Sequence, residues 1–216
     1  MPEPVVFLLD DDESIVVALG RMLQADGFAF RAWTSAKEFL ETHDPESAGC
    51  LVTDVRMPGM SGLELQRALL ERNSERPIVF VTGHGDIPTT VQAMRAGAVS
   101  FLSKPISRAE LVAAVREAIA KDAEARARRR ERQDIARRLA SLTPREHQVL
   151  DLIATGMLNK QIAAELGAAE KTIKVHRGRI MEKMQVRTAA ALVGLLWRAK
   201  AQTRVHADVT GLGQAS

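Results

Sequence analysis

Acidic, hydroxyl and basic residues stand at the ends of four short apolar segments, and together they could bind and transfer a phosphoryl group. One segment runs into the acidic residues 10–12 and another into Asp54. Two more end at Thr82 and close to Lys104. Carboxylates bind divalent cations, whereas hydroxyl and ammonium groups bind phosphoryl oxygens. These residue types predict a phosphoryl site with a metal ion, provided that the fold brings them together.

The acidic residues have the composition of a magnesium site. Mg²⁺ in proteins takes one or two carboxylates together with waters and phosphate oxygens. Asp11 and Asp54 are the expected direct ligands, Asp10 the expected ligand through water, and the carbonyl of Arg56 a further ligand. Without a cation, two carboxylates about 4 Å apart repel by roughly 4 kcal/mol at an effective dielectric constant of about 20. We therefore expect the cation to stabilise this part of the chain.

The remaining residues suit phosphoryl transfer to an aspartate. A carboxylate can attack a phosphoryl donor to give an acyl phosphate, which makes Asp54 the expected acceptor. Lys104 can neutralise one transferred oxygen, and the Thr82 hydroxyl can donate a hydrogen bond to another. Each residue alone is more typical of a turn or a helix cap. The prediction therefore requires all of them to lie at one edge of the fold.

The segments that carry these residues alternate with helical patterns. Continuous apolar runs of four or five residues are typical of buried strands in a parallel sheet, and ligands bind at the carboxyl ends of such strands. The expected strands are Val5–Leu9, Phe28–Ala32, Cys50–Thr53, Ile78–Val81 and Val99–Leu102, and the expected helices span 14–26, 36–40, 63–70, 88–97 and 107–119. This order predicts an α/β fold, a flavodoxin-like five-stranded parallel sheet with helices on both faces.

The charge of the chain divides it into two parts. Residues 1–120 contain 11 Lys and Arg against 17 Asp and Glu, a net charge of −6, whereas residues 121–216 contain 19 against 10, a net charge of +9. An acidic part joined to a basic part favours a regulatory domain joined to a polyanion-binding domain. The single Cys50, the lack of a signal-peptide pattern and the lack of a membrane-length apolar stretch predict a soluble cytoplasmic protein with no membrane contact.

The second part of the chain has helical patterns only. We expect an α/β domain at 1–120, a basic helical linker at 121–140, a small all-α domain at 141–200 and a disordered tail at 201–216. The arginine-rich linker contains no helix breaker and should be a solvated spacer that extends the preceding helix. A coiled-coil contact and a contact with the DNA backbone are the alternatives for it. Thr143 and Glu146 form a capping box, with Pro144 at the first helical position, where the all-α domain begins.

Residues 1–120 resemble the receiver domain of two-component response regulators. The matching motifs are Asp10-Asp11, Asp54, Met57-Pro58-Gly59-Met60-Ser61-Gly62, Thr82-Gly83-His84-Gly85-Asp86 and Lys104-Pro105. The resemblance implies that a sensor histidine kinase phosphorylates Asp54, that Asp10, Asp11, Asp54 and the Arg56 carbonyl bind Mg²⁺, and that the peptide bond before Pro105 is cis. It implies a phosphoacceptor that catalyses only its own phosphotransfer and dephosphorylation. It also implies a switch in which Thr82 and Phe101 reorient, with Phe101 standing where the wider family commonly has Tyr.

Residues 141–199 resemble the LuxR-type helix-turn-helix domain. The matching motifs are Leu142-Thr143-Pro144-Arg145-Glu146, Asn159-Lys160-Gln161-Ile162-Ala163 and Lys171-Thr172-Ile173-Lys174-Val175-His176. Together with the loop at residues 83–88, the two resemblances indicate the NarL/FixJ class of response regulators. They imply a transcription factor whose phosphorylation promotes dimerisation and sequence-specific binding to promoter DNA. RNA polymerase is a further partner that they suggest.

A helix from about Glu170 to Met184 is the expected DNA-reading element. Its apolar stripe, Ile173, Ile180 and Met184, should face the domain core. The expected DNA contacts on its other side are Lys171, Thr172, Lys174, Val175, Gly178 and Arg179, because basic and small residues suit the major groove. Gly178 would let the backbone approach DNA closely, although glycine lowers the intrinsic stability of a helix.

A fourth helix of this domain is expected from Thr188 to about Ala199. It carries the leucines Leu192, Leu195 and Leu196, which give it more apolar surface than one small domain needs. The resemblance assigns this surface to the dimer contact on DNA.

Three other functions fit parts of the sequence. A metal-dependent phosphohydrolase needs a second acid two residues beyond its nucleophile, where Arg56 stands. A nucleotide-binding enzyme needs a Gly-rich loop followed by Lys-Ser/Thr, which the sequence lacks. A constitutive DNA binder with a vestigial receiver would not need an intact acidic pair together with Asp54, Thr82 and Lys104. The response-regulator hypothesis accounts for all of these residues.

Overall fold

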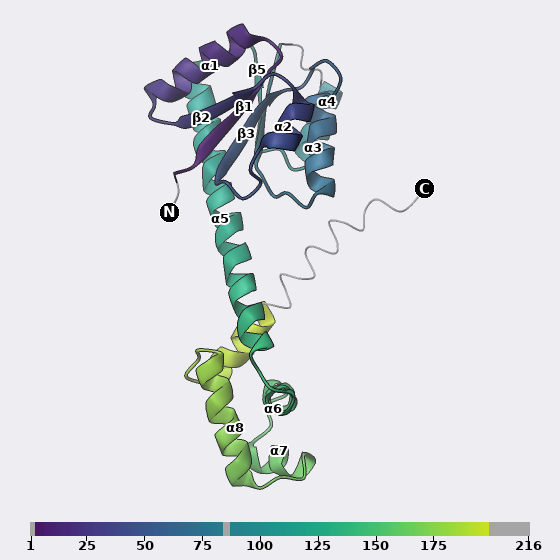
Figure 1. Cartoon of the computed structure of the whole chain (residues 1–216), viewed down its shortest axis with the longest axis vertical. Coiled ribbons are helices and arrows are strands. Elements are labelled where there is room, and N and C mark those ends of the chain that lie inside the picture. Colours follow the sequence, from purple (N-terminus) through teal and green to yellow (C-terminus); the bar gives the residue numbers. More distant parts are fainter. Residues whose placement is uncertain (1–2, 84–86, 199–216) are drawn as a thin grey trace, which may run out of the picture. The chain divides into compact units, whose positions relative to one another are not determined.

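The computed structural model describes residues 3–83 and 87–198, and the chain forms two compact units, residues 1–127 and 128–216 (Figure 1). The predicted disordered tail at 201–216 and the loop residues 84–86 lie outside the described residues. Within the described ranges, no helix has the length and apolar character needed to cross a membrane.

The first unit is built on a sheet of five parallel strands. The strands are β1 (Val5–Leu9), β2 (Ala29–Trp33), β3 (Gly49–Asp54), β4 (Ile78–Thr82) and β5 (Ser100–Ser103). Their spatial order is β2-β1-β3-β4-β5, with every neighbouring pair parallel. The flavodoxin-like fold predicted from the sequence is confirmed, with strand bounds within one residue of those expected.

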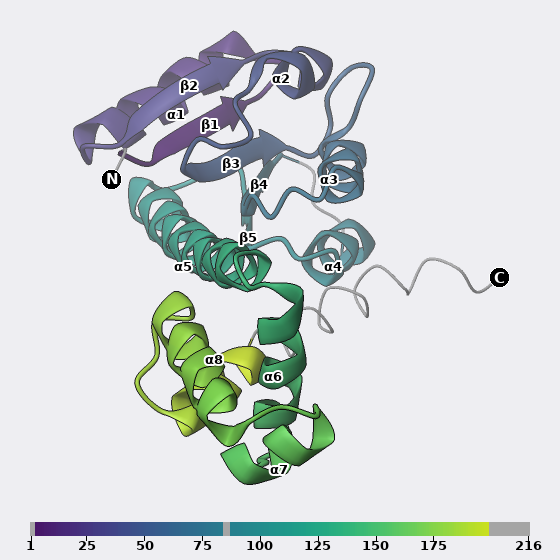
Figure 2. The same cartoon turned by 60° about the horizontal axis from the view of Figure 1, so that its bottom comes forward.

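Five helices cover the two faces of this sheet (Figures 1 and 2). They are α1 (Glu13–Ala25), α2 (Ala36–Thr42), α3 (Gly62–Glu71), α4 (Ile87–Arg95) and α5 (Arg108–Ala140). Side chains alternate along each strand, so Val6 and Leu8 of β1 pack with α1 and α5, whereas Phe7 and Leu9 pack with α2 and α3. The two apolar layers hold the strand ends, and the polar residues on them, in fixed positions.

Helix α5 continues through the predicted linker without a break and spans 33 residues. The prediction that the linker extends the preceding helix is confirmed. The linker is nevertheless divided between the two units, because residues up to 127 belong to the first and residues from 128 to the second. Ala125 is buried in the first unit, and Ile135 lies in the apolar core of the second.

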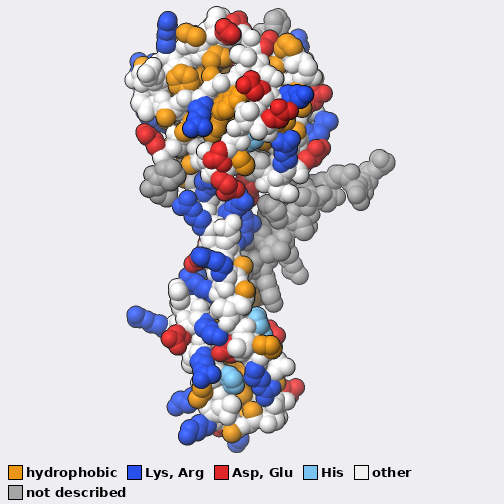
Figure 3. Space-filling model, viewed as in Figure 1, with side chains coloured by type: hydrophobic (Ala, Val, Ile, Leu, Met, Phe, Trp, Pro, Cys, Tyr) orange, Lys and Arg blue, Asp and Glu red, His pale blue; other side chains and the backbone are white. Residues whose placement is uncertain are grey.

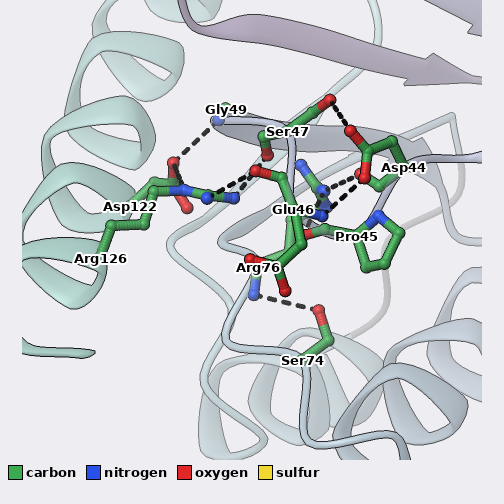
Figure 4. Close-up of polar contacts among 9 residues, drawn as sticks. All are labelled: Asp44, Pro45, Glu46, Ser47, Gly49, Ser74, Arg76, Asp122 and Arg126. Atoms are coloured by element: carbon green, nitrogen blue, oxygen red, sulfur yellow. Dashed lines mark hydrogen bonds and ion pairs between the residues drawn. The ribbon is translucent and has the colours of Figure 1, made fainter. Parts of the chain in front are cut away.

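A group of polar contacts fastens α5 to the loop before β3 (Figure 4). Asp122, only 5% exposed, accepts hydrogen bonds from the Gly49 N–H and from Arg126 Nε, both at 2.8 Å. Arg126 also donates to the carbonyls of Glu46 and Ser47, at 2.8 and 2.5 Å. We call these five residues the clasp. Position 49 requires glycine, because a Cβ there would lie 1.8 Å from the Val5 carbonyl oxygen at a φ of +136°.

The second unit is a small helical domain. Its helices are α6 (Pro144–Ala154), α7 (Asn159–Glu165), α8 (Glu170–Lys183) and a helical segment at residues 189–198. The Thr143–Glu146 capping box is present, with Thr143 Oγ1 accepting from the Glu146 N–H at 3.3 Å. One apolar core gathers residues from all four helices and from the end of α5.

The structure corrects the expected dimer contact. Leu192 and Leu195 are 0% and 7% exposed and lie in the core of their own domain, and Leu196 packs against that core. Because the domain is small, it uses the leucines that seemed surplus to it. Leu192 and Leu195 are therefore not available to a second copy. The exposed large apolar residue of this segment is Trp197, at 70%.

Candidate phosphoryl site and nucleic-acid interface

The polar residues predicted to share one edge of the sheet do so. Asp54 ends β3, Thr82 ends β4, and Asp10 and Lys104 directly follow β1 and β5. Because β3 lies between β1 and β4, the three strand ends are adjacent. Lys104 Nζ lies 2.7 Å from Asp10 Oδ2 and 3.4 Å from Asp54 Oδ2, whereas the Thr82 side chain is buried beside them at the end of β4.

Three carboxylates at this edge can hold a cation. Asp10, Asp11 and Asp54 each offer an oxygen, and these oxygens all lie within 4.8 Å of one another. An all-oxygen donor set with exposed Asp11 beside it fits the partly hydrated coordination of Mg²⁺. Asp10 is oriented from both sides, because its Oδ1 accepts from the Asp12 N–H at 3.0 Å and its Oδ2 from Lys104. Arg56 lies in the following loop with its side chain exposed.

The third consecutive acid has a separate task. Asp12 is the N-cap of α1, and its Oδ1 accepts hydrogen bonds from the backbone N–H and the hydroxyl of Ser14, at 2.8 and 2.6 Å. A capping carboxylate at a helix N-terminus satisfies a free backbone donor and interacts well with the helix dipole. The expectation that Asp10 and Asp11 form the acidic pair agrees with this arrangement.

Burial and charge act in opposite directions on Asp54. Burial raises the pKa of its carboxyl group, and the nearby charge of Lys104 and the Val55 N–H only partly offset this effect. Burial also lowers the pKa of Lys104, but its hydrogen bond to Asp10 and the charges of Asp10 and Asp54 outweigh burial and raise that pKa. Lys104 is thus held as a cation against two carboxylates, which is where a transferred phosphoryl group would bring further negative charge.

The loop after Asp54 depends on a glycine whose role the sequence did not reveal. The Gly62 N–H donates to the Val55 carbonyl at 2.9 Å, and a Cβ at position 62 would lie 2.2 Å from the Asp54 carbonyl oxygen. The start of α3 therefore touches the backbone of Asp54 directly. The Val55 N–H in turn donates to Asp54 Oδ1 at 2.7 Å, which orients the carboxylate.

Two further expectations concern β5 and the residues after it. The peptide bond between Lys104 and Pro105 is cis, as the resemblance implied. Phe101 is half-buried and packs against Phe80, with ring centroids 6.1 Å apart. Phe101 lies on β5 opposite Phe80 of β4, two positions before the pair of Thr82 and Ser103.

Helix α8 presents the predicted DNA-contacting face to solvent. Ile173, Ile180 and Met184 are fully buried, as expected. The six residues predicted to contact DNA are all exposed, namely Lys171, Thr172, Lys174, Val175, Gly178 and Arg179. The N-cap of the helix, Ala169, makes no side-chain hydrogen bond, and a Cβ at Gly178 would meet no atom within 4 Å. No packing contact within the described chain requires glycine there.

An ion pair missed by the sequence analysis fixes the far end of α8. Lys183 Nζ donates to Glu146 Oε2 at 2.7 Å and to the Ser141 carbonyl at 2.9 Å. The hydrogen bond from Lys183, followed by that from the Thr143 N–H, lowers the pKa of the Glu146 carboxyl group to about 2. The capping box showed the local role of Glu146, but its partner 37 residues away could not be read from helix periodicity.

A parallel sheet with an acidic cluster at its carboxyl edge, followed by a helical domain with a basic exposed helix, defines a signal-receiving DNA-binding protein. The family described as "Response regulator receiver domain" matches residues 6–116, and the family described as "Bacterial regulatory proteins, luxR family" matches residues 140–196. The chain belongs to the two-component response regulators with a LuxR-type DNA-binding domain, which regulate transcription.

Curated relatives and solved structures agree with this family. Nodulation protein W of Bradyrhizobium diazoefficiens is 46% identical, over 88% of this chain and 83% of its own. The transcriptional regulatory protein FixJ of Azorhizobium caulinodans is 41% identical, over 89% and 92%. The structure of the response regulator StyR is 48% identical with a TM-score of 0.84, covering 91% of this chain and 99% of its own. Full-length FixJ from B. japonicum is 39% identical, with a TM-score of 0.57 and coverage of 93% and 99%.

Proposed function

We propose that a sensor histidine kinase phosphorylates Asp54 and that this modification switches the protein to its DNA-binding state. The observation that supports this most strongly is the position of Asp54 beside a lysine and two further carboxylates at the carboxyl edge of the sheet. In the transfer, the nitrogen–phosphorus bond of a phosphohistidine breaks and a bond forms between phosphorus and an Asp54 carboxylate oxygen.

The residues around Asp54 have distinct tasks in this proposal. Asp10, Asp11, Asp54 and the Arg56 carbonyl would hold Mg²⁺, which neutralises charge on the phosphoryl oxygens when bound. Lys104 moves its ion pair from the carboxylates to a phosphoryl oxygen, and the Thr82 hydroxyl donates to another. Phe101 follows Thr82, because the two residues lie on neighbouring strands. The chain modifies only itself and turns over no other substrate.

The second unit reads promoter DNA through α8. Lys171, Lys174 and Arg179 supply positive charge for phosphates or base edges, and Val175, 48% exposed, suits a thymine methyl group. Thr172 and Gly178 complete the exposed face, and Gly178 allows a close approach of the backbone. We place this function in the cytoplasm, and RNA polymerase is a further partner that the family resemblance suggests.

Phosphorylation should also produce a homodimer. Two copies would read two half-sites about one helical turn of DNA apart. Of the three leucines first assigned to the contact, only Leu196 is not fully buried, and the exposed Trp197 next to it is the better anchor. Exposed aromatic residues are enriched at such contacts.

The proposal is tested by incubating the full-length protein with acetyl phosphate and Mg²⁺ and measuring its intact mass. We expect a gain of one phosphoryl group in the wild type and none in Asp54→Asn. Undiminished labelling of Asp54→Asn would show that another residue is the acceptor. Labelling that leaves DNA binding unchanged would instead favour a constitutive DNA binder.

A further inference from the structure

The second half of α5 carries more positive charge than a spacer needs. Residues 128–138 contain six arginines and only two acids, Glu131 and Asp134. Asp134 forms ion pairs with Arg137 and Arg138, and Glu131 lies 3.6 Å from Arg198. The segment keeps a net charge of +4.

This segment is mounted on the DNA-binding unit. Ile135 is buried in the core of that unit, and Arg138 Nη1 donates to the Met184 carbonyl at the end of α8, at 3.2 Å. The clasp, in contrast, ends at Arg126 and belongs to the first unit. The arginines after residue 127 therefore have a fixed position relative to the helix that is proposed to read DNA.

Three of the arginines form one exposed face. At 3.6 residues per turn, Arg129, Arg130 and Arg137 lie on the side of α5 opposite to the buried Ile135, and all three are exposed. We call these residues the arginine face. Figure 3 shows Lys and Arg side chains gathered over the second half of α5 and over α8 on the same visible side.

The position of the arginine face suits DNA that flanks the bases read by α8. The contact between Arg138 and Met184 ties this part of α5 to the C-terminal end of α8, and Arg137 of the arginine face is the neighbouring residue. Lys171 lies about 20 Å away, near the other end of this helix of 14 residues. A recognition helix contacts base edges mainly through its N-terminal residues, so the C-terminal end of α8 and the arginines beside it would lie towards the phosphates that flank those bases. Guanidinium groups bind phosphates with paired, charge-assisted hydrogen bonds.

We propose that the arginine face is a second DNA contact, which binds the phosphate backbone beside the site read by α8 and does not distinguish sequences. The proposal rests on the DNA-binding function proposed above for α8. A coiled coil with a second copy would need an apolar seam. The positions between the arginines on this face, Gln133 and Ala136, do not provide one.

The test is the salt dependence of binding to a duplex of arbitrary sequence. The full-length protein, treated with acetyl phosphate and Mg²⁺, is titrated by fluorescence anisotropy against a labelled 30-base-pair duplex at several salt concentrations. Each lost phosphate contact reduces the slope of log K against log salt by about 0.9. The variant with Arg129→Gln, Arg130→Gln and Arg137→Gln should lower the slope by about 2.7. Replacing the same three residues by lysine keeps the positive charge and should therefore preserve most of the wild-type slope.

A matched control removes the same charge from the first unit, through Arg21→Gln, Arg31→Gln and Arg67→Gln, all at exposed positions. Its slope should stay close to that of the wild type. The proposal is overturned if the arginine-face variant binds like this control. If neither the arginine-face variant nor Lys174→Ala changes DNA binding, both this proposal and the proposed function of α8 are wrong. If Lys174→Ala weakens binding and the arginine-face variant does not, then α8 contacts DNA and the arginine face does not.

Discussion

At the scale of single residues, the site is organised by Lys104. Its ammonium group contacts Asp10 and Asp54 at once, which partly relieves the repulsion among the clustered carboxylates. Asp11, the third member, is exposed and has the freest access to a cation from solvent. Asp12 stands apart, because its carboxylate caps α1. The tasks of these three consecutive aspartates thus differ according to which backbone donor or side chain each one contacts.

The acidic cluster leads to a prediction about magnesium. A cation that binds only the folded protein stabilises it by RT ln(1 + [L]/Kd), about 2.7 kcal/mol at a hundredfold excess over Kd. Mg²⁺ should therefore raise the melting temperature of the wild type and have much less effect on Asp11→Ala. Thermal melts with and without Mg²⁺ measure both shifts. Equal shifts in the two proteins would exclude Asp11 as a ligand.

The pair of Glu146 and Lys183 leads to a prediction about pH. The folded-state pKa of Glu146, about 2, lies below its ordinary value of 4.5. A depressed pKa contributes stability that is present above pH 4.5 and is lost as the pH falls towards about 2. Glu146→Gln should therefore destabilise the DNA-binding unit near pH 7 and progressively less below pH 4.5. Urea denaturation over this range tests it, and a constant difference at all pH values would contradict the assigned ion pair.

At the scale of elements, α5 is one helix with two attachments. The clasp fastens it to the loop before β3, and Ile135 and Arg138 fasten it to the second unit. Residues 127–134 lie between these attachments, and the boundary between the two units falls among them. The helix is therefore not a free spacer. Its first part packs in the first unit, and its second part packs in the second unit.

The clasp leads to a prediction about stability. Asp122→Ala removes the acceptor of the buried Gly49 N–H, which should cost about 1–3 kcal/mol, because a buried donor is left without a partner. The control Lys121→Ala breaks only the exposed pair with Glu117 and should cost less than about 1 kcal/mol. Urea unfolding followed by Trp33 fluorescence in a Trp197→Phe background measures both. Equal losses would show that the clasp adds nothing beyond a surface pair.

Helix α8 leads to a prediction in which stability and binding change in opposite directions. A Cβ at Gly178 meets nothing in the described chain, so Gly178→Ala should stabilise the helix by about 0.5–1 kcal/mol. If the backbone approaches DNA there, the same methyl group should weaken DNA binding. Urea denaturation measures the free energy of unfolding, and fluorescence anisotropy on the same preparation measures the affinity for DNA. Greater stability with unchanged binding would mean that DNA does not approach position 178.

Element positions could be predicted from the sequence because short apolar runs and caps are local features. The apolar run that ends at Asp54 predicted β3 to within one residue at its start and end. Helix periodicity correctly predicted that Ile173 and Ile180 are buried. Contacts between distant residues could not be predicted in this way. The bond from Gly49 to Asp122 joins residues 73 positions apart, and no pattern marks it. The leucines of the last helical segment were misread for a similar reason, because their periodicity does not say whether the core or a partner covers them.

At the scale of the whole molecule, charge separates the two functions. The acidic part holds the cluster around Asp54, where negative charge is concentrated for a cation. The basic part, with a net charge of +9 over residues 121–216, carries α8 and the arginine face. A polyanion is attracted to the second part and repelled by the first, so electrostatics alone makes binding to DNA directional and sensitive to salt.

Control of DNA binding by phosphorylation of Asp54 can be tested in one comparison. Wild-type protein and Asp54→Asn, each with and without acetyl phosphate and Mg²⁺, are measured for promoter binding and for molecular mass in solution at one fixed salt concentration. We predict that only the phosphorylated wild type forms a dimer and binds tightly. The switch would be contradicted if the unphosphorylated wild type, or Asp54→Asn after the same treatment, bound the promoter as tightly as the phosphorylated wild type.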